Sequence, residues 1–285
     1  MNSSQFKTNE FKKLCAIISF KPKEVENIVN NLDNYYKEWI EKKLDKKTGL
    51  PKIYLDRTEK KRTIRSSQKE LKIIQLRIKN KILVPIKLPK VVHGGVKKCS
   101  NITNAKPHQG NKYIFTTDLQ EFYPNISSKR VYEMFTNFFS PHFSHWITNI
   151  TTWKYELPQG TPTSTHIANL VFLKTDIELI NFCNQNNITY TRYVDDLTFS
   201  SQQDFKSHLN EILNIVTKND FKLSYRKTQY KGNQTITGIN VFLNKIDAPE
   251  KIIEKSKIEI ETNSELKPIT NYLKNIRKTN KKPSH

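Results

Sequence analysis

The chain has 285 residues, which is long enough for one large domain or two small ones with a sizeable core. Its 48 lysine and arginine residues outnumber its 27 aspartate and glutamate residues, giving a formal net charge of +21. Because 36% of the residues are hydrophobic and 11% are aromatic, a disordered basic tail is excluded. The charge favours nucleic acid over acidic membrane as the partner, although an AT-rich coding bias also raises the lysine content.

Cysteine spacing and apolar runs indicate the compartment. Cys15, Cys99 and Cys183 form no C-x-x-C pair, so the sequence predicts neither a disulfide framework nor a zinc cage. The longest apolar run near the N-terminus, residues 14 to 20, is too short to span a membrane, and no small-residue cleavage site follows it. We therefore expect a reducing, cytoplasmic compartment and no membrane partner.

Helical spacing of apolar residues predicts two helices in the first third of the chain, over residues 23 to 44 and 68 to 83. Residues 60 to 65 between them read Lys-Lys-Arg-Thr-Ile-Arg. The alternation around Ile64 predicts a short strand that presents cationic side chains. A solvated run of charge is the alternative for this segment.

The rest of the chain alternates between strand and helix patterns. Residues 112 to 118 alternate like a strand that ends at a carboxylate, Asp118. The elements predicted after it are a helix at 128 to 139, a long buried helix through Ala168 and Ile180, strands at 188 to 193 and 197 to 200, a helix at 204 to 218, and strands at 221 to 225 and 234 to 242. This order predicts an α+β fold with an antiparallel sheet backed by helices.

The tip of the predicted hairpin carries two adjacent carboxylates, Asp195 and Asp196, and the strand that ends at Asp118 could lie beside it. Adjacent carboxylates repel each other unless a cation compensates, and oxygen ligands of this kind suit Mg²⁺. The three side chains could hold two metal ions about 4 Å apart for phosphoryl transfer. The alternative is that the hairpin aspartates only accept hydrogen bonds from turn amides.

Three segments resemble, in order, the central motifs of reverse transcriptases. They are Thr-Asp-Leu-Gln-Glu-Phe-Tyr-Pro-Asn-Ile at 117 to 126, Leu-Pro-Gln-Gly-Thr-Pro-Thr-Ser at 157 to 164 and Tyr-Val-Asp-Asp at 193 to 196. Further matches are the finger motif at 61 to 75, the palm motif Arg-Lys-Thr at 226 to 228 and the primer-grip region at 235 to 238. The resemblance covers about residues 50 to 245.

Two more segments narrow the resemblance to the retron-type enzymes of bacteria. Asn-Ala-Lys-Pro-His at 104 to 108 is similar to their Asn-Ala-x-x-His signature, and Ile-Thr-Gly at 236 to 238 is similar to their Val-Thr-Gly. Residues 92 to 100 also resemble the stretch before that signature. One departure is Thr165, which stands where the family's motif commonly ends in proline.

The resemblance implies a right-hand polymerase fold with fingers, an antiparallel-sheet palm and a small helical thumb. It implies N-terminal helices and fingers at 1 to 111, the palm with inserted finger helices at 112 to 243, and a short thumb with a basic tail at 244 to 285. The tail either follows the template-primer backbone or frays.

The same resemblance implies catalytic roles residue by residue. Asp118 and Asp195 would be the principal ligands of two Mg²⁺ ions, with Asp196 as the third carboxylate. Lys227 matches a lysine proposed to protonate the departing pyrophosphate, a role that needs a pKa nearer neutrality. A surface ion pair is the alternative for Lys227.

Nucleotide binding is implied for four further residues. Tyr123 stands where the family has an aromatic steric gate, whose ring clashes with a ribonucleotide 2′-hydroxyl and so favours dNTPs; an ordinary core tyrosine is the alternative. Gln159 would support the incoming nucleotide. Arg62 and Arg65 are both candidates to hold its triphosphate, and the sequence does not choose between them.

RNA or primer binding is expected for Asn104, His108, Thr237 and Gly238. For Asn104 and His108 a structural role is the alternative. The sequence does not decide which chemistry this signature serves.

Together these matches imply an enzyme, an RNA-directed DNA polymerase (a nucleotidyltransferase) of the retron type. It would prime from a 2′-hydroxyl of its own structured noncoding RNA and make single-stranded DNA linked to RNA, termed msDNA, in bacterial antiphage defence. Expected partners are that RNA, its RNA-DNA product, dNTPs and an effector protein, while the oligomeric state is left open. The alternatives are another stand-alone bacterial reverse transcriptase, of the abortive-infection or diversity-generating type, and a non-catalytic RNA-binding scaffold.

Overall fold

The structure, a computed structural model, describes residues 8–44, 49–53, 57–262 and 265–280. They form two compact units. The first unit is drawn from Met1–Lys87 and Tyr123–Val171, and the second unit from Leu88–Phe122 and Phe172–His285. Every helix described is too short or too polar to cross a membrane.

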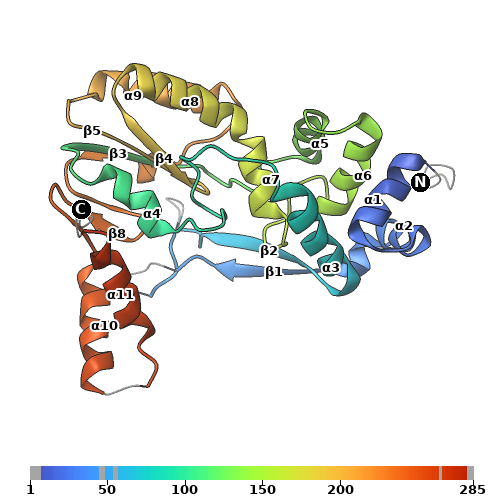
Figure 1. Ribbon diagram of the computed structural model, residues 1–285, viewed down its shortest axis with the longest axis horizontal. Helices are drawn as coiled ribbons and strands as arrows, with labels where there is room; N and C mark the ends of the chain where they lie inside the picture. Colours follow the sequence, from blue (N-terminus) through green and yellow to red (C-terminus); the bar gives the residue numbers. More distant parts are fainter. Residues whose placement is uncertain (1–7, 45–48, 54–56, 263–264, 281–285) are drawn as a thin grey trace, which may run out of the picture. The chain divides into compact units, whose positions relative to one another are not determined.

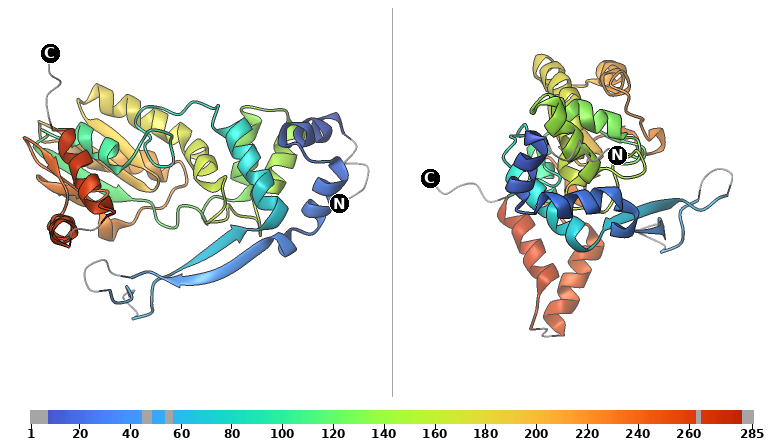
Figure 2. Two further views of the ribbon diagram at one scale, coloured as in Figure 1. Left: turned by 60° about the horizontal axis from the view of Figure 1, so that its bottom comes forward. Right: turned by 90° about the vertical axis from the view of Figure 1, so that its right-hand side faces the viewer.

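The first unit combines helices with a two-stranded ribbon. Its elements are α1 (Asn9–Ile18), α2 (Pro22–Asn30), the 3₁₀ helix Leu32–Tyr35, β1 (Tyr36–Lys42), β2 (Lys61–Ser67), α3 (Lys69–Ile78) with a π-helical turn at Lys79–Leu83, α5 (Ser128–Thr136), α6 (Pro141–Thr151) and α7 (Ser164–Val171). Helices α1 and α3 pack against each other and against α6. Strands β1 and β2 pair antiparallel over their whole length, as the blue ribbon in Figure 2 shows.

The ribbon corrects one prediction from helical spacing. Residues 23 to 44 do not form a single helix, because α2 ends at Asn30 and β1 begins at Tyr36. Trp39 and Ile40 fit a helical stripe, but 38% and 65% of their surfaces are exposed, so no core lies along that stripe. Backbone pairing with β2, which is distant in the sequence, decides the conformation, and Tyr, Trp and Ile all suit a strand.

Other predictions in this unit are confirmed. The strand expected around Ile64 is β2, and the helix expected at 68 to 83 is α3 with its π-helical turn. The helix expected at 128 to 139 begins at Ser128 as predicted but ends at Thr136. Its first turn is capped by the Ser127 hydroxyl, which accepts a hydrogen bond from the Arg130 amide.

An antiparallel sheet forms the centre of the second unit. In the order β4-β5-β3-β6, its strands are β4 (Thr189–Tyr193), β5 (Asp196–Ser201), β3 (Tyr113–Asp118) and β6 (Gln229–Lys231). Helix α8 (Leu173–Gln185) packs on β4 and lies beside α9 (Leu209–Thr217), as Figure 1 shows. In the core, the rings of Phe115 and Phe199 lie 5.8 Å apart. The predicted antiparallel sheet with helices behind it is confirmed.

The long buried helix predicted through Ala168 and Ile180 is broken. It consists of α7 and α8, with Phe172 between them. The Phe172 ring is fully buried, and its centroid lies 6.0 Å from that of Phe122 and 4.6 Å from that of Phe221. Packing of this ring takes precedence over an unbroken helix, which local periodicity cannot reveal.

The strand predictions after α9 are correct in part. Residues 221 to 225 form only one bridge, between Leu119 and Leu223, because they lie alongside the residues after the end of β3 and then enter the 3₁₀ helix Tyr225–Lys227. Residues 234 to 242 form two strands, β7 (Gln234–Ile236) and β8 (Ile239–Val241). Thr237 and Gly238 make the turn between them with φ values of 44° and 84°; glycine adopts the second value readily, whereas a β-branched threonine rarely adopts the first.

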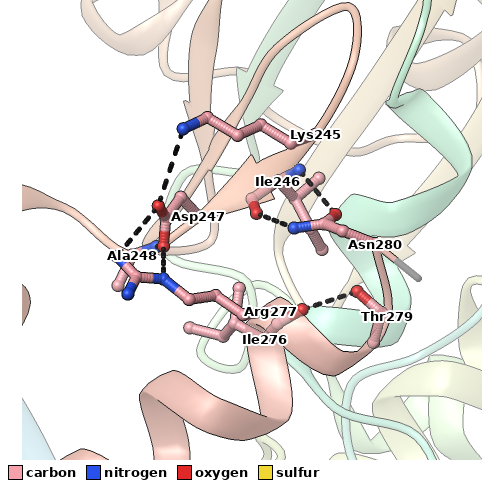
Figure 3. Close-up of polar contacts among 8 residues, drawn as sticks. All are labelled: Lys245, Ile246, Asp247, Ala248, Ile276, Arg277, Thr279 and Asn280. Atoms are coloured by element: carbon pink, nitrogen blue, oxygen red, sulfur yellow. Dashed lines mark hydrogen bonds and ion pairs between the residues drawn. The ribbon is translucent and has the colours of Figure 1, made fainter.

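The last described elements of the second unit are β9 (Ile246–Asp247), α10 (Glu250–Glu261) and α11 (Pro268–Lys278). Strand β9 completes a sheet with β7 and β8. Figure 3 shows how α11 is tied to β9: Arg277 Nε donates to Asp247 Oδ1 at 3.0 Å, and the Asn280 amide makes two hydrogen bonds to the Ile246 backbone. The predicted basic tail ends in residues 281 to 285, which lie outside the described residues. The limits of fingers, palm and thumb stay a prediction.

Candidate active site

Three carboxylates meet at one end of the central sheet of the second unit. In the register of β3 and β5, Asp118 lies opposite Asp196. The β4–β5 hairpin turns through Val194 and Asp195, with Tyr193 paired to Asp196. The amide of Leu119, the residue after β3, donates to the Asp195 carbonyl at 2.9 Å. The sheet therefore brings together the ends of two sequence motifs that are far apart in the chain.

The carboxylates strongly affect one another and a neighbouring lysine. Burial, followed by the charges of Asp195 and Asp118, raises the pKa of Asp196 to about 7. Lys227 Nζ lies 2.5 Å from Asp118 Oδ2. Burial lowers the pKa of Lys227, but the hydrogen bond and the charge of Asp118 outweigh it, so the pKa is raised. The structure thus shows the ion pair that was the alternative role for Lys227, and its pKa moves away from the value that suits a general acid.

The donor set suits a divalent cation. Asp118, Asp195 and Asp196 offer carboxylate oxygens, the ligands that Mg²⁺ prefers. Burial and the two neighbouring carboxylates raise the pKa of Asp196 despite the charge of Lys227, and a bound cation would favour its charged form. Within the described ranges, no group of three or more His, Cys, Asp or Glu side chains is placed so that it could hold a metal ion as it stands. The carboxylates therefore fit the ion by their chemistry, but their side-chain positions in this structure do not form a three-ligand metal site.

The arginines expected to hold a triphosphate lie on β2 in the first unit, each paired to a carboxylate. Arg62 Nη2 lies 2.7 Å from Glu41 Oε2. Arg65 Nε lies 2.5 Å from Glu38 Oε2, and its guanidinium also pairs with Glu156. Three positions apart on a strand, Arg62 and Arg65 lie on opposite faces of the ribbon. The structure does not gather them at one point.

Arg65 is the arginine that lies beside Gln159. The Arg65 amide donates to the Gln159 carbonyl at 2.7 Å. The next residue of that loop, Gly160, has φ 118° and lies so close to β2 that an added Cβ would meet Ile64 Cγ2 at 3.0 Å. A side chain on residue 160 would therefore strain this contact. Ser164 at the start of α7 closes the loop by donating from Oγ to the Pro158 carbonyl.

Tyr123 is half-buried in the first unit, close to the start of α7. Its hydroxyl lies 3.1 Å from Thr165 Oγ1. Thr165 is the residue that stands in place of the family's proline, and it lies in the first turn of α7 as expected. The Ile126 carbonyl accepts from the Leu157 amide at 2.8 Å, which fastens the Gln159 loop to the segment that carries Tyr123.

The signature residues Asn104 and His108 are fully buried in the second unit. His108 Nδ1 lies 2.6 Å from Ser200 Oγ and its Nε2 lies 2.7 Å from Thr191 Oγ1, so the ring bridges β5 and β4. Burial lowers the pKa of His108 to about 3, which keeps the ring neutral. Asn104 Nδ2 donates to Thr237 Oγ1 at 3.3 Å.

Burial favours the structural alternative for Asn104 and His108, because a ligand cannot reach either side chain as they stand. By contrast, Thr237 is half-buried and Gly238 is exposed. Of the four residues expected to bind RNA or primer, the two in the turn between β7 and β8 are therefore the accessible ones.

The buried ion pair between β4 and α8 was not predicted from the sequence. Arg192 and Asp176 are both completely buried, with Arg192 Nη2 2.6 Å from Asp176 Oδ2. The available signal was an arginine inside the strand predicted at 188 to 193, because a buried charge needs a partner. The partner could not be found in the same way, since Asp176 reads as an ordinary helix residue.

Comparison with known proteins gives named relatives of this chain. It is 29% identical over 221 residues to the Retron Se72 reverse transcriptase of Salmonella heidelberg, covering 76% of this chain and 55% of that protein. It is 30% identical over 191 residues to the Retron Ec86 reverse transcriptase of Escherichia coli (65% and 60%) and 29% identical over 223 residues to the Retron Mx162 reverse transcriptase of Myxococcus xanthus (66% and 46%). The chain thus spans about half the length of these relatives. The resemblance to retron-type enzymes is confirmed.

Among solved structures, a truncated apo telomerase from Candida tropicalis matches with a TM-score of 0.45 and 10% identity, over 81% of this chain and 61% of that one. That score is below the level at which two chains can be said to share a fold. The family model described as "Reverse transcriptase (RNA-dependent DNA polymerase)" matches residues 40–241. Since this match covers most of the chain, the chain belongs to the reverse transcriptase family and has its α+β right-hand polymerase fold.

Proposed function

We propose that this chain is a retron-type reverse transcriptase, which copies a cognate structured noncoding RNA into single-stranded DNA that stays linked to RNA. The retron reverse transcriptases among its relatives and the signature at residues 104 to 108 support this. We assign residues 1 to 111 to N-terminal helices and fingers, 112 to 243 to the palm with inserted finger helices, and 244 to 285 to a short thumb and basic tail. The biological setting would be antiphage defence in the bacterial cytoplasm, together with an effector protein.

One observation carries the catalytic part of the proposal. Asp118 and Asp196 are register partners, and Asp195 occupies the adjoining turn. RNA binding alone needs no cluster of carboxylates, whose negative charge repels phosphate. Phosphoryl transfer does need one, because metal ions balance the charge of both the carboxylates and the nucleotide.

In this proposal Asp118 and Asp195 would hold two Mg²⁺ ions, with Asp196 as the third carboxylate. The ions would supply Lewis-acid stabilisation of the attacking hydroxyl and of the leaving oxygens. Lys227 would donate a proton to the departing pyrophosphate once the metal ions neutralise Asp118, because the unneutralised carboxylate raises the pKa of Lys227. Its pairing with Asp118 holds the proton donor beside the carboxylates.

Nucleotide recognition would use the first unit. Arg65 is the preferred partner of the triphosphate, because its backbone is bonded to that of Gln159, whereas Arg62 lies on the other face of the ribbon. The ring of Tyr123, held through its hydroxyl by Thr165, would exclude a ribose 2′-hydroxyl and so select dNTPs.

RNA and primer would be bound through charge and through the turn of β7 and β8. The net charge of +21 suits contact with phosphates. Thr237 and Gly238 would touch the primer, and Asn104 would support the turn from below through its bond to Thr237. His108 would act inside the unit, where it bridges β4 and β5.

The direct test is DNA synthesis by the chain purified with its co-expressed RNA. With dNTPs and Mg²⁺, the wild type should make DNA, and Asp195→Asn with Asp196→Asn should make none. The matched control is Asp204→Asn with Glu211→Gln, which removes two exposed carboxylates from the same unit and should leave synthesis unchanged.

The linkage of the product separates the alternatives. If the enzyme is of the retron type, RNase treatment should leave a branched RNA stub on the DNA. Debranching treatment should then release this stub. DNA without a branch would favour another stand-alone reverse transcriptase. Tight RNA binding with no DNA from any variant would overturn the enzymatic proposal in favour of a scaffold.

A further inference from the structure

The turn that carries Asp195 has an unfavourable backbone conformation. Val194, the first residue of the two-residue turn between β4 and β5, has φ 59°. Glycine is the usual residue at such a position, and a β-branched side chain there is a genuine outlier. A conformation of this kind persists only where its surroundings enforce it. The structure should therefore contain groups that hold Val194 in place.

Arg192 is the first of these groups. Its Nη1 donates to the Val194 carbonyl at 2.8 Å, and this carbonyl belongs to the peptide that leads into Asp195. The same guanidinium is fixed by Asp176, with Nε 2.9 Å from Oδ1 and Nη2 2.6 Å from Oδ2. Tyr190 donates from its hydroxyl to Asp176 Oδ1 at 2.8 Å, and the Phe172 ring lies 4.7 Å from the guanidinium. Arg192 has therefore little freedom to leave the Val194 carbonyl.

Residues 91 to 94 are the second group. They run beside β4, where the Arg192 amide donates to the Val91 carbonyl and the His93 amide donates to the Arg192 carbonyl, both at 2.8 Å. Gly94 then lies directly against the turn: a Cβ on this residue would meet Val194 N at 2.4 Å and Cγ2 at 2.5 Å. Both sides of the strained residue are thus held by parts of one unit.

We propose that Arg192 is a positioning residue for catalysis: fixed by Asp176, it holds the Val194 carbonyl and so keeps the strained turn that presents Asp195. The proposal rests on the proposed function, because it assigns Arg192 to the geometry of that same site. It also explains why an arginine is needed. A guanidinium can bind both oxygens of Asp176 and still donate to a third acceptor, whereas a lysine ammonium at this position satisfies the charge of Asp176 but not this geometry.

The main test is Arg192→Lys, which keeps a positive charge next to Asp176. We expect kcat for DNA synthesis to fall about 100-fold, because a small displacement of a catalytic group is that costly, while KM for dNTPs and affinity for the RNA change less than about twofold. The Mg²⁺ concentration for half-maximal rate should rise. The Mn²⁺-induced increase in Tm, which needs no turnover, should shrink.

The most specific test is whether Val194→Gly restores the kcat that Arg192→Lys loses. Glycine takes φ 59° at little cost, so the turn should no longer depend on Arg192. Val194→Gly in the Arg192→Lys background should recover about tenfold of the lost kcat, although it removes further packing. The neutral pair Arg192→Gln with Asp176→Asn, which leaves no unpaired buried charge, should show the same loss and the same rescue.

Two controls separate positioning from stability. Tyr190→Phe removes one bond to Asp176 but leaves the Arg192 contacts, and should keep kcat within about twofold. Ile215→Ala in α9 is a core truncation away from the turn that should lower Tm without changing the Mg²⁺ requirement. If Arg192→Lys loses activity only as far as Tm falls, or if Val194→Gly restores nothing, the proposal is wrong. Absence of DNA synthesis by the wild type would instead overturn the proposed function.

Discussion

The sheet end with the three aspartates in the second unit and the β1–β2 ribbon with Arg62 and Arg65 in the first unit hold their charged side chains in different ways. Asp118 and Asp196 are register partners in a sheet, so the fold itself sets their positions. Arg62 and Arg65 are held by ion pairs to Glu41 and Glu38, which a triphosphate could replace. The difference indicates that the fold sets the positions of the carboxylates, whereas the arginines proposed to bind nucleotide would have to exchange partners.

The largest effect expected in the first unit is on sugar selection. Tyr123→Ala removes the ring that would meet a 2′-hydroxyl, and the preference for dNTPs over rNTPs should fall about 100-fold. The measurement is kcat/KM for dGTP and GTP on the same template. Tyr132→Ala on α5, another half-buried tyrosine of this unit, should leave the preference unchanged. If Tyr123→Ala keeps the same preference for dNTPs over rNTPs as Tyr132→Ala, Tyr123 is an ordinary core residue.

The two arginines of the ribbon should differ. Arg65→Ala removes the charge that lies beside Gln159, so KM for dNTPs should rise about tenfold with little change in kcat. Arg62→Ala removes a charge from the opposite face, and its effect on KM should stay within about twofold. Steady-state kinetics with varied dNTP would decide. A larger effect from Arg62 would reverse the choice made from the backbone contact.

Stability below neutral pH tests the buried polar bridge of the second unit. The folded-state pKa of His108 is about 3, below the 6.5 of an unfolded histidine, so the unfolded chain binds a proton first as the pH falls. The neutral ring should contribute fully above pH 6.5, and stability should drop by about 1 kcal/mol per pH unit below it, towards pH 3. Denaturant midpoints for the wild type and His108→Gln should show a weaker dependence in the variant. Parallel curves would mean that His108 is not the titrating group.

The smallest effect should come from the carboxylates that pair with the arginines. Glu38→Gln weakens the competitor for Arg65, and KM for dNTPs should fall about twofold, since exposed ion pairs contribute little. Glu41→Gln, which frees Arg62 instead, is the matched control and should not change KM. An increase in KM for Glu38→Gln would show that this carboxylate orients Arg65 rather than competing for it.

Local sequence patterns predict the strands that carry the three aspartates well, and they predict pairs between distant parts of the chain poorly. The strand ending at Asp118 and the hairpin with Asp195 at its tip follow from alternation and turn chemistry, and both are present. Tyr36 to Lys42 read as helix because their partner, β2, lies elsewhere in the sequence. Asp176 gives no local sign that it fixes Arg192, since the contact exists only after α8 packs on β4.

Asp118, Asp195 and Asp196 are proposed to form a divalent-metal site. Binding of Mn²⁺, measured by electron paramagnetic resonance on the full chain freed of RNA, tests it without any need for activity. The wild type and Asp204→Asn should bind alike, and Asp118→Asn and Asp195→Asn should each bind at least about tenfold more weakly. Equal binding by all four proteins would contradict the claim and remove the basis for two-metal catalysis at this end of the sheet.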